Sequence, residues 1–556
     1  MTVRYITDIM VFLGGLGMFI FGMKIMSNGL QKSAGTKMKQ LLEMLTKSKL
    51  MGIIVGMIVT GIIQSSTATT VMVVGFVNAG LMNLTQSVGI ILGANIGTTF
   101  TAWIVASAEW LEYLNPVFLA PIAIFIGVAM IIVAKSDKTR SIGEIITGFG
   151  ILFMGMATMS SALHGYRASP FWSDLFVALG SNPLLGIFAG ILVTSVIQSS
   201  TASIAILQSL ALAGLVPWNA AVYIIIGQNV GTCLTAILSS LGASKNAKAA
   251  AFIHLLYNVA GAAVVGTLSV IYFYFINSSF GSSLVTATSI SAFHSGYNVA
   301  ILIIFYPFTN ALVYFAKKFV KAEDTEEEDI TLLHLDDRIL ETPGFAVESF
   351  KKEIIRLSKI TMENFLLAAE SLFDRDEAKI DKVFKREQNI DILSQSITLY
   401  LVKLCNSNIS KREYNLITPM FHIIHDIERI GDHSENLAEL AQFAAAEDVN
   451  LSPAAHTELI EIIKHTESSL ENCISALESE KAGNLECLMK AEELEDELDI
   501  MEERLRASHI KRLTSGECIP TAGVFFLDVL SNLERVGDHA INIVQAVELG
   551  YAKKKG

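Results

Sequence analysis

Two copies of a polar pentapeptide lie inside apolar stretches of this 556-residue chain, 134 residues apart. The first copy is Gln64-Ser65-Ser66-Thr67-Ala68, and the second is Gln198-Ser199-Ser200-Thr201-Ala202. Hydroxyl and amide groups in an apolar segment cost free energy unless something binds them. Their oxygens suit a hard cation such as Na⁺, whereas hydroxyls at a helix N-terminus suit an oxyanion. The doubled motif therefore predicts one binding site for small ions, built from both copies.

A second motif repeats with the same separation. Gly93-x-Asn95-x-Gly97-Thr98 is matched by Gly227-x-Asn229-x-Gly231-Thr232. Interrupted hydrophobic segments at corresponding positions of two halves indicate the binding site of a transporter. The alternative is a duplication kept for packing, because small residues let membrane helices approach closely. Packing accounts for the glycines but not for a repeated glutamine.

The composition predicts a membrane part followed by a water-soluble part. Apolar residues make up 52% of the chain, yet residues 1–316 carry a net charge of +6 and residues 317–556 one of −19. Such an acidic second part disfavours nucleic-acid binding. The five cysteines show no metal-binding spacing and indicate free thiols in a reducing compartment.

The positions of the basic residues predict the topology, because loops rich in Lys and Arg face the cytoplasm. Full spans are expected near 5–24, 86–108, 116–134, 145–164, 218–240, 249–275 and 295–316. The stretches 50–80 and 183–213, which hold the polar pentapeptides, must each return to the side they entered from, as re-entrant helical hairpins. Repeats over about 1–134 and 135–275 then contain three crossings each, and an odd number makes them inverted. A final span, 295–316, completes a transporter domain over 1–316.

The second part reads as an acidic linker over 317–344 and a cytoplasmic helical domain over 345–556. Apolar residues recur with helical spacing, and breaks near 375–378, 406–411, 447–453, 482–485 and 514–520 leave six helices, or two three-helix bundles. Glu-Arg-x-Gly-Asp-His occurs twice, from Glu428 and from Glu534. Carboxylates four residues apart share a helix face and repel unless a cation lies between them. The alternative for each such pair is a solvent-facing charged surface.

Two family resemblances rest on these motifs. The doubled Gln-Ser-Ser-Thr and Gly-x-Asn-x-Gly-Thr resemble the type II Na⁺/phosphate cotransporter family, although that family's motif often ends in Ser where this chain has Thr67 and Thr201. The second part is similar to the PhoU domain, a pair of three-helix bundles with ExxxD metal motifs. The first resemblance implies that phosphate and sodium bind at Gln64, Ser65, Ser66, Thr67, Gln198, Ser199, Ser200 and Thr201, with Asn95, Thr98, Asn229 and Thr232 as further contributors. The second implies that di- or trivalent metal ions bind at Glu387, Asp391, Glu428, Asp432, Glu492, Asp496, Glu534 and Asp538.

Together these features predict an all-α, multi-pass protein of a bacterial inner membrane that moves inorganic phosphate with Na⁺ by alternating access. The alternatives are a phosphate exporter, a carrier of a related oxyanion, and a membrane sensor that no longer transports. The chain lacks a P-loop and an HExxH motif, so an enzyme is not expected. The lipid bilayer is one expected partner, and a homodimer is left open. A weaker echo, His254-x-x-Tyr257-Asn258 and His294-x-x-Tyr297-Asn298, is interpreted as packing or capping rather than as a proton relay.

Overall fold

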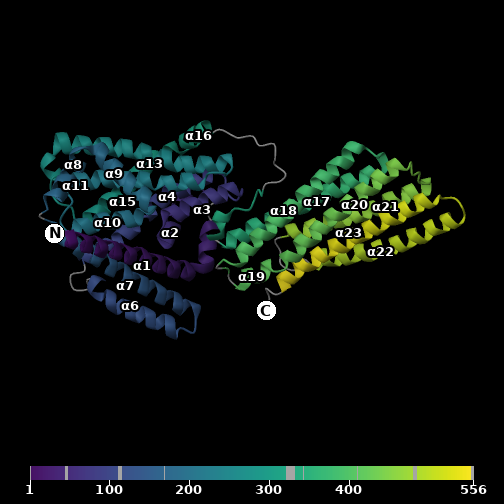
Figure 1. The fold of residues 1–556 in the computed structure, drawn as a ribbon, viewed down its shortest axis with the longest axis horizontal. Helices are drawn as coiled ribbons and strands as arrows, with labels where there is room; N and C mark the ends of the chain where they lie inside the picture. Colours follow the sequence, from purple (N-terminus) through teal and green to yellow (C-terminus); the bar gives the residue numbers. More distant parts are fainter. Residues whose placement is uncertain are drawn as a thin grey trace. The chain divides into compact units, whose positions relative to one another are not determined.

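The computed structural model describes residues 2–43, 48–110, 116–167, 169–320, 332–341, 343–407, 409, 411–479 and 485–552. Within this part the chain is all-helical, as predicted, and its only β-type pairing is an isolated bridge between Pro217 and Leu284. The chain divides into two compact units, Met1–Glu323 and Asp324–Gly556. Both are seen in Figure 1, and each is described by itself.

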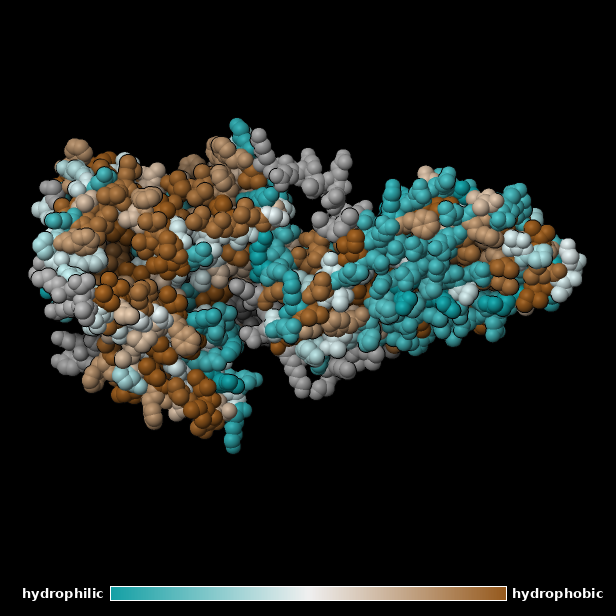
Figure 2. Space-filling model, in the orientation of Figure 1, coloured by the Kyte–Doolittle hydropathy of each residue, from teal (hydrophilic) through white to brown (hydrophobic). Residues whose placement is uncertain are grey.

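The first unit is built from apolar helices. Among its described residues, six stretches are long and apolar enough to cross a membrane: Tyr5–Ala34, Leu84–Glu109, Asp137–His164, Trp218–Ser239, Lys245–Ile276 and Ala287–Phe319. Apolar side chains cover much of the outside of this unit in Figure 2, whereas the second unit is largely hydrophilic there. The α-helices of the first unit are α1 (Thr2–Glu43), α2 (Lys49–Ile63), α3 (Ser66–Asn78), α4 (Leu84–Gly97), α5 (Thr99–Trp110), α6 (Pro116–Val133), α7 (Asp137–His164), α8 (Pro170–Ser181), α9 (Pro183–Ile197), α10 (Ser200–Leu212), α11 (Trp218–Gly231), α12 (Cys233–Ser239), α13 (Lys245–Ile271), α14 (Ser278–Gly281), α15 (Ala287–Phe305) and α16 (Thr309–Phe319).

Two expectations for this unit need correction. The span expected at 5–24 belongs to a longer helix, α1, which continues through the lysine-rich segment because lysine is a good helix former. The span expected at 116–134 is occupied by α6 (Pro116–Val133), an apolar helix that is shorter than the six spans. The segment 165–182, between the span expected at 145–164 and the hairpin expected at 183–213, was expected to be a loop but contains α8, which starts at a proline suited to a first helical turn and meets α9 at a bend of 111°.

The two repeats pack in the same register. A β-carbon added at Gly97 would lie 2.6 Å from the Met57 carbonyl oxygen, and one added at Gly231 would lie 2.8 Å from that of Ile191. Each residue of the second contact lies 134 positions after its counterpart. Helix α4 therefore lies against α2 as α11 lies against α9, with backbones so close that only glycine fits.

Helices α1 and α7, which open the two repeats, run antiparallel. A β-carbon at Gly15 would meet the backbone of Gly155, one at Gly22 that of Gly148, and one at Gly29 that of Ser141. The residue numbers rise along α1 while they fall along α7, so the helices point in opposite directions. An ion pair between Lys32 Nζ and Glu144 Oε1, 2.7 Å apart, joins the same two helices.

The described part of the second unit forms the six long helices expected from the sequence and one short α-helix, α19. Its core includes fully buried aromatic side chains such as Phe350, Phe365, Phe525 and Phe526. The linker expected at 317–344 is partly helical, since α16 reaches Phe319 and a 3₁₀ turn covers Asp337–Glu341; residues 321–331 and 342 lie outside the described part. The helices are α17 (Pro343–Asp374), α18 (Glu377–Cys405), α19 (Lys411–Ile417), α20 (Met420–Ala446), α21 (Pro453–Glu478), α22 (Leu485–Thr514) and α23 (Pro520–Ala552).

Candidate functional site

Each polar pentapeptide lies at a break between two helices. Gln64 ends α2 with φ 57° and ψ 22°, and Gln198 ends α9 with φ 56° and ψ 24°. This left-handed conformation is unfavourable for a residue with a β-carbon, and such strain is typical of functional sites. Next to it, the Ser65 and Ser199 side chains accept hydrogen bonds from the backbone N–H groups of residues 68 and 202 and so cap α3 and α10.

Matching hydrogen bonds hold the two arms of each broken helix together. Thr60 Oγ1 donates to Thr69 Oγ1 across the first break at 3.0 Å. Thr194 Oγ1 donates to Ser203 Oγ across the second at 2.9 Å, again 134 residues later. Both repeats therefore fold their motif into a helix–break–helix unit of the same internal design.

The two breaks meet in space. Ser66 Oγ lies 3.5 Å from Ser200 Oγ, and both side chains are buried. These serines are the first residues of α3 and α10, so the N-terminal ends of two helices converge on one point, and both ends carry a partial positive charge. The arrangement provides hydroxyl groups and helix N-termini for an anion without an Arg or Lys in either motif.

The same glutamine has different surroundings in the two halves. Gln64 is buried; its Oε1 accepts a 2.6 Å hydrogen bond from Thr101 Oγ1, and its Nε2 donates to the Gly61 carbonyl. Gln198 is exposed, and its side chain makes no hydrogen bond within the described residues, although Thr235 stands at the position equivalent to Thr101. Thr101 is thus a partner that the motif search missed, and the 134-residue register was the signal that could have found it.

The other candidates of the membrane unit lie on α4 and α11 or just after them. Asn95 contacts α13, whereas Asn229 Nδ2 donates to the Ile225 carbonyl of its own helix at 3.0 Å. The hydroxyls of Thr98 and Thr232 donate to backbone carbonyls of the preceding turn. Thr67 is half-buried at the first break, and Thr201 is buried at the second, 3.0 Å from Ser199 Oγ.

In the second unit, three of the four predicted metal ligands of the first bundle, Glu387, Asp391 and Asp432, come together, whereas the fourth, Glu428, does not. Oxygen atoms of Glu387, Asp391 and Asp432 all lie within 4.8 Å of one another. Burial, together with the negative charges of Asp391, Glu435 and Asp432, raises the pKa of Glu387 to about 7. Glu428 is not part of this cluster and lies 3.5 Å from His425 Nδ1 instead.

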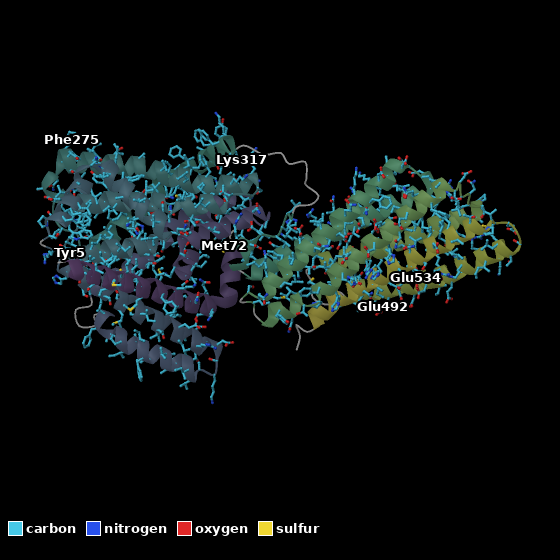
Figure 3. The ribbon with its side chains drawn as sticks, in the orientation of Figure 1. Tyr5, Met72, Phe275, Lys317, Glu492 and Glu534 are labelled. Carbon is cyan, nitrogen blue, oxygen red and sulfur yellow. The ribbon has the colours of Figure 1, made fainter. Side chains whose placement is uncertain are left out.

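The equivalent cluster in the second bundle differs in membership. Asp538 lies with Glu495 and Asp499 within 4.8 Å, and not with the predicted pair Glu492 and Asp496. That pair lines a polar hollow beside Asp538, and Figure 3 labels Glu492 on α22 and Glu534 on α23. Helix α22 carries the ExxxD pattern twice, three residues apart, so the pattern alone could not choose between the two. Burial and neighbouring carboxylates also raise the pKa of Asp538 and Glu534.

The duplicated Gly-Asp-His segments face each other between the two bundles. His433 Nδ1 lies 2.9 Å from Asn532 Oδ1, and His539 Nδ1 lies 2.9 Å from Asp426 Oδ1. The two imidazole rings stack with centroids 5.7 Å apart. These reciprocal contacts place Asp432 and Asp538, the residues that precede the histidines, on two adjoining helices, α20 and α23.

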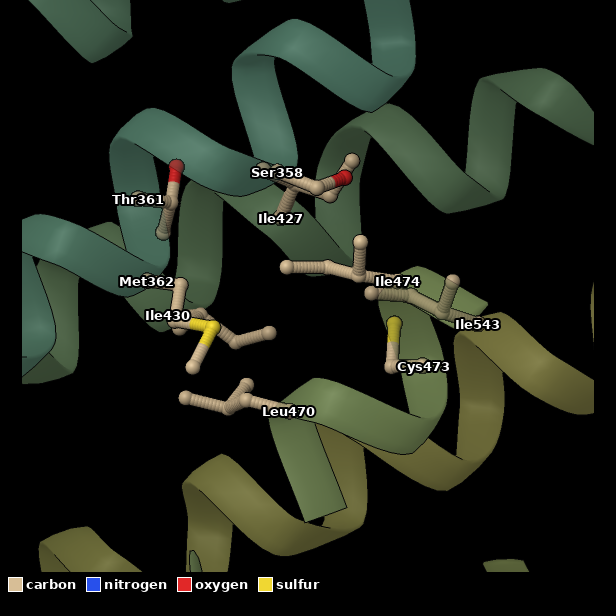
Figure 4. A pocket seen from close by; sticks show the side chains of 9 residues that line it. All are labelled: Ser358, Thr361, Met362, Ile427, Ile430, Leu470, Cys473, Ile474 and Ile543. Atoms are coloured by element: carbon tan, nitrogen blue, oxygen red, sulfur yellow. The ribbon is translucent and has the colours of Figure 1, made fainter. Parts of the chain in front are cut away.

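A cavity between the central helices of this unit does not suit phosphate. Figure 4 shows its lining, in which Thr361 and Ser358 provide the only hydroxyls and the other side chains are apolar or a thiol. The lining residues are Ser358, Thr361, Met362, Ile427, Ile430, Leu470, Cys473, Ile474 and Ile543.

The acidic cluster gives a pH-dependent prediction. Since folding raises the pKa of Glu387 from 4.5 to about 7, the folded metal-free protein holds a proton that the unfolded chain has released over this range. The contribution of Glu387 to stability is therefore full below about pH 4.5 and is lost as the pH rises to about 7. With a chelator present to remove metal ions, the melting temperature of the parent should fall relative to that of Glu387→Gln as the pH rises from about 4.5 to about 7. At pH 8, Mn²⁺ should raise the melting temperature of the parent more than that of Glu387→Gln, which keeps the second cluster intact. Equal pH profiles and equal Mn²⁺ shifts would contradict the first cluster.

Comparisons with known proteins agree with this two-part organisation. Residues 18–161 and 168–286 match the Na⁺/Pi-cotransporter family, and residues 354–441 and 459–547 match the PhoU domain. An Escherichia coli protein named "Putative inorganic phosphate export protein YjbB" is 23% identical over 540 residues, which are 96% of each chain. The phosphate-specific transport system accessory protein PhoU homolog 1 of Thermotoga maritima is 25% identical over 35% of this chain and 83% of its own. The sodium-dependent phosphate transport protein 2B of Pongo abelii is 30% identical over 33% of this chain and 27% of its own.

Proposed function

The membrane half of this chain belongs to the Na⁺/Pi-cotransporter family and its second half is a PhoU domain, and from this premise we propose a secondary transporter that couples Na⁺ to phosphate movement. Phosphate is proposed to bind where α3 and α10 converge, and Na⁺ at oxygen atoms of the motif residues. Since neither motif supplies a cation, co-bound Na⁺ would balance the charge of the phosphate. The PhoU domain is proposed to be cytoplasmic and to regulate transport.

The observation that carries this proposal is the contact between Ser66 and Ser200. Residues at equivalent positions of a duplicated chain meet only near the axis that relates the copies. A site on such an axis can be reached from either side of the membrane if the two copies are inverted. The antiparallel course of α1 and α7 supports inverted repeats, and the helix–break–helix units support re-entrant hairpins, so alternating access at this point is our proposed mechanism.

Uptake of radiolabelled phosphate into proteoliposomes tests the proposal. An inward Na⁺ gradient should accelerate uptake at least tenfold over an equal K⁺ gradient, and an excess of arsenate would show whether related oxyanions compete. Uptake that ignores Na⁺ would remove the coupling ion from the proposal. Absence of flux under every gradient would favour a sensor.

Export is the second candidate function, because the relative that spans 96% of this chain is named as an export protein. The site as described does not define a direction, since the driving gradient decides the direction of a coupled carrier. Phosphate-loaded proteoliposomes with Na⁺ inside should release phosphate faster than the same vesicles with K⁺ inside. Stimulated release together with negligible uptake would support export.

The metal clusters of the PhoU domain give a prediction about regulation. Replacing Asp432 and Asp538 together by alanine removes one carboxylate from each cluster. We expect the double variant to lose the response of uptake to chelator and Mn²⁺ while phosphate affinity stays within about twofold of the parent. Asp528→Ala, on the same helix as Asp538 and outside both clusters, is the control. Weakened phosphate binding in the double variant would contradict a separate regulatory role.

A further inference from the structure

The repeated His-x-x-Tyr-Asn segments lie on two helices that occupy equivalent places in the membrane unit. The first is on α13 and the second on α15, and in both the histidine and the asparagine are buried. Helix α13 contacts α3 and α12, while α15 contacts α10 and α5, which are the counterparts of those helices in the other repeat. Helix α15 therefore packs against the second repeat in the same way as α13 packs against the first.

Helix α13 holds both ends of one side-chain amide of the proposed transport site. Asn95 Nδ2 donates to Asn258 Oδ1 at 3.1 Å, and Asn95 Oδ1 lies 3.3 Å from His254 Nε2. Asn258 is itself fixed, because its Nδ2 donates to the His254 carbonyl at 2.9 Å. With both amide ends bonded, the orientation of Asn95 is set by α13.

The corresponding contacts are missing in the second repeat. Asn298 Nδ2 donates to the His294 carbonyl at 2.8 Å, as its counterpart does, but Asn298 Oδ1 is buried without a hydrogen-bond partner in the described structure. Asn229, the counterpart of Asn95, turns its amide toward the Ile225 carbonyl. A buried carbonyl oxygen without a donor costs free energy, so its retention calls for a second state in which it is bonded.

We propose that these two His–Asn pairs are clamps that position Asn95 and Asn229 and close in turn as the transporter changes state. The clamp on α13 is closed in this structure and the clamp on α15 is open. The difference between Gln64, bonded to Thr101, and Gln198, exposed, follows the same division between the halves. The inference rests on the proposed function for its role in transport, but not for its geometry.

Leucine substitutions separate the clamp from ordinary packing. If Asn298 only filled space, Asn298→Leu would remove one unbonded oxygen and one bond to the His294 carbonyl, and should leave both stability and transport close to the level of the parent. We expect the melting temperature to stay close to that of the parent, but Na⁺-driven phosphate uptake to fall at least tenfold. Asn258→Leu should lower both. Uptake by Asn298→Leu equal to that of the parent would overturn the proposal.

Histidine substitutions test positioning directly. His254→Gln retains a donor near the place of Nε2, whereas His254→Leu does not, so only the leucine variant should raise the Na⁺ concentration for half-maximal uptake, by at least fivefold. Ser295→Ala is the control, since it removes the 2.8 Å bond from Trp103 Nε1 to a neighbour of His294 without touching a clamp. If His254→Gln and His254→Leu have the same Na⁺ dependence, His254 does not position Asn95.

Cross-linking tests the geometry without requiring transport. Cysteine pairs at 95 and 258, and separately at 229 and 298, are treated in membranes with a short thiol cross-linker, after the five native cysteines are replaced by alanine. If the clamps alternate, both pairs cross-link; linkage of the first pair alone means that the open clamp never closes. A parent that shows no flux but cross-links at both pairs would disprove the proposed function and retain the clamps.

Discussion

Gln64→Gly is expected to abolish Na⁺-driven phosphate uptake while changing the stability of the protein little. Gln64 has φ 57°, a conformation that glycine adopts without strain, so the substitution relieves about 1 kcal/mol. It also removes the amide that accepts from Thr101 Oγ1 at the proposed site. Loss of this buried hydrogen bond opposes the strain relief, so stability should change little while uptake is lost, as measured by thermal melting and by proteoliposome uptake.

Gln198→Gly should give the same loss of uptake, because Gln198 shares the conformation and the motif position. We expect a reduction of at least 100-fold for each variant. Asp448→Gly is the matched control: Asp448 has φ 47° but lies in the other unit, so the same backbone relief should leave uptake unchanged. Normal uptake by Gln64→Gly or Gln198→Gly would show that the replaced side chain is not part of the transport site, and its backbone strain would then have no functional reason.

Gly22→Ala is expected to prevent the membrane unit from folding. The added β-carbon would lie 2.7 Å from the Gly148 carbonyl oxygen and closer still to the backbone nitrogen of Leu152. Backbone atoms cannot rotate away as a side chain can, so α1 and α7 must separate along their length, at a cost of about 3 kcal/mol or more. The yield of monodisperse protein in detergent and its melting temperature should both fall.

Gly17→Ala is the control for this substitution. Gly17 lies on the same helix, but no atom is found within 4 Å of its added β-carbon, so alanine should be neutral or should stabilise the helix by up to about 1 kcal/mol. Gly148→Ala should reproduce the defect of Gly22→Ala from the opposite helix. Equal yields for Gly22→Ala and Gly17→Ala would contradict the antiparallel packing that supports inverted repeats.

Much of the organisation follows from the sequence, because the signals concerned are local or periodic. The 134-residue register identified both polar pentapeptides, and the structure places a helix break at each of them. The helical spacing of apolar residues after 345 predicted six long helices, and these are present. The helix expected at 5–24 continues beyond residue 24, and the segment expected as a linker overlaps helical turns at Thr309–Phe319 and Asp337–Glu341, since lysine-rich and acidic segments can continue a helix as well as end one.

The choice between overlapping patterns required tertiary contacts. On α22, both ExxxD pairs have the same spacing, and only packing against α23 brings Glu495 and Asp499 to Asp538. The His-x-x-Tyr-Asn echo was interpreted as packing or capping, because a sequence does not show which helix faces it. The contact between this segment and Asn95 is seen only in the structure, where α13 packs against α4.

The sequence by itself determined that this protein has two like halves in a membrane and an acidic helical domain after them. It could not distinguish one half from the other, because identical motifs carry identical information. Only the tertiary structure brought Ser66 to Ser200 and gave Gln64 and Gln198 different surroundings. The physical reason is that burial and hydrogen bonding depend on neighbours distant in the chain, and those neighbours are arranged differently around two copies of the same motif.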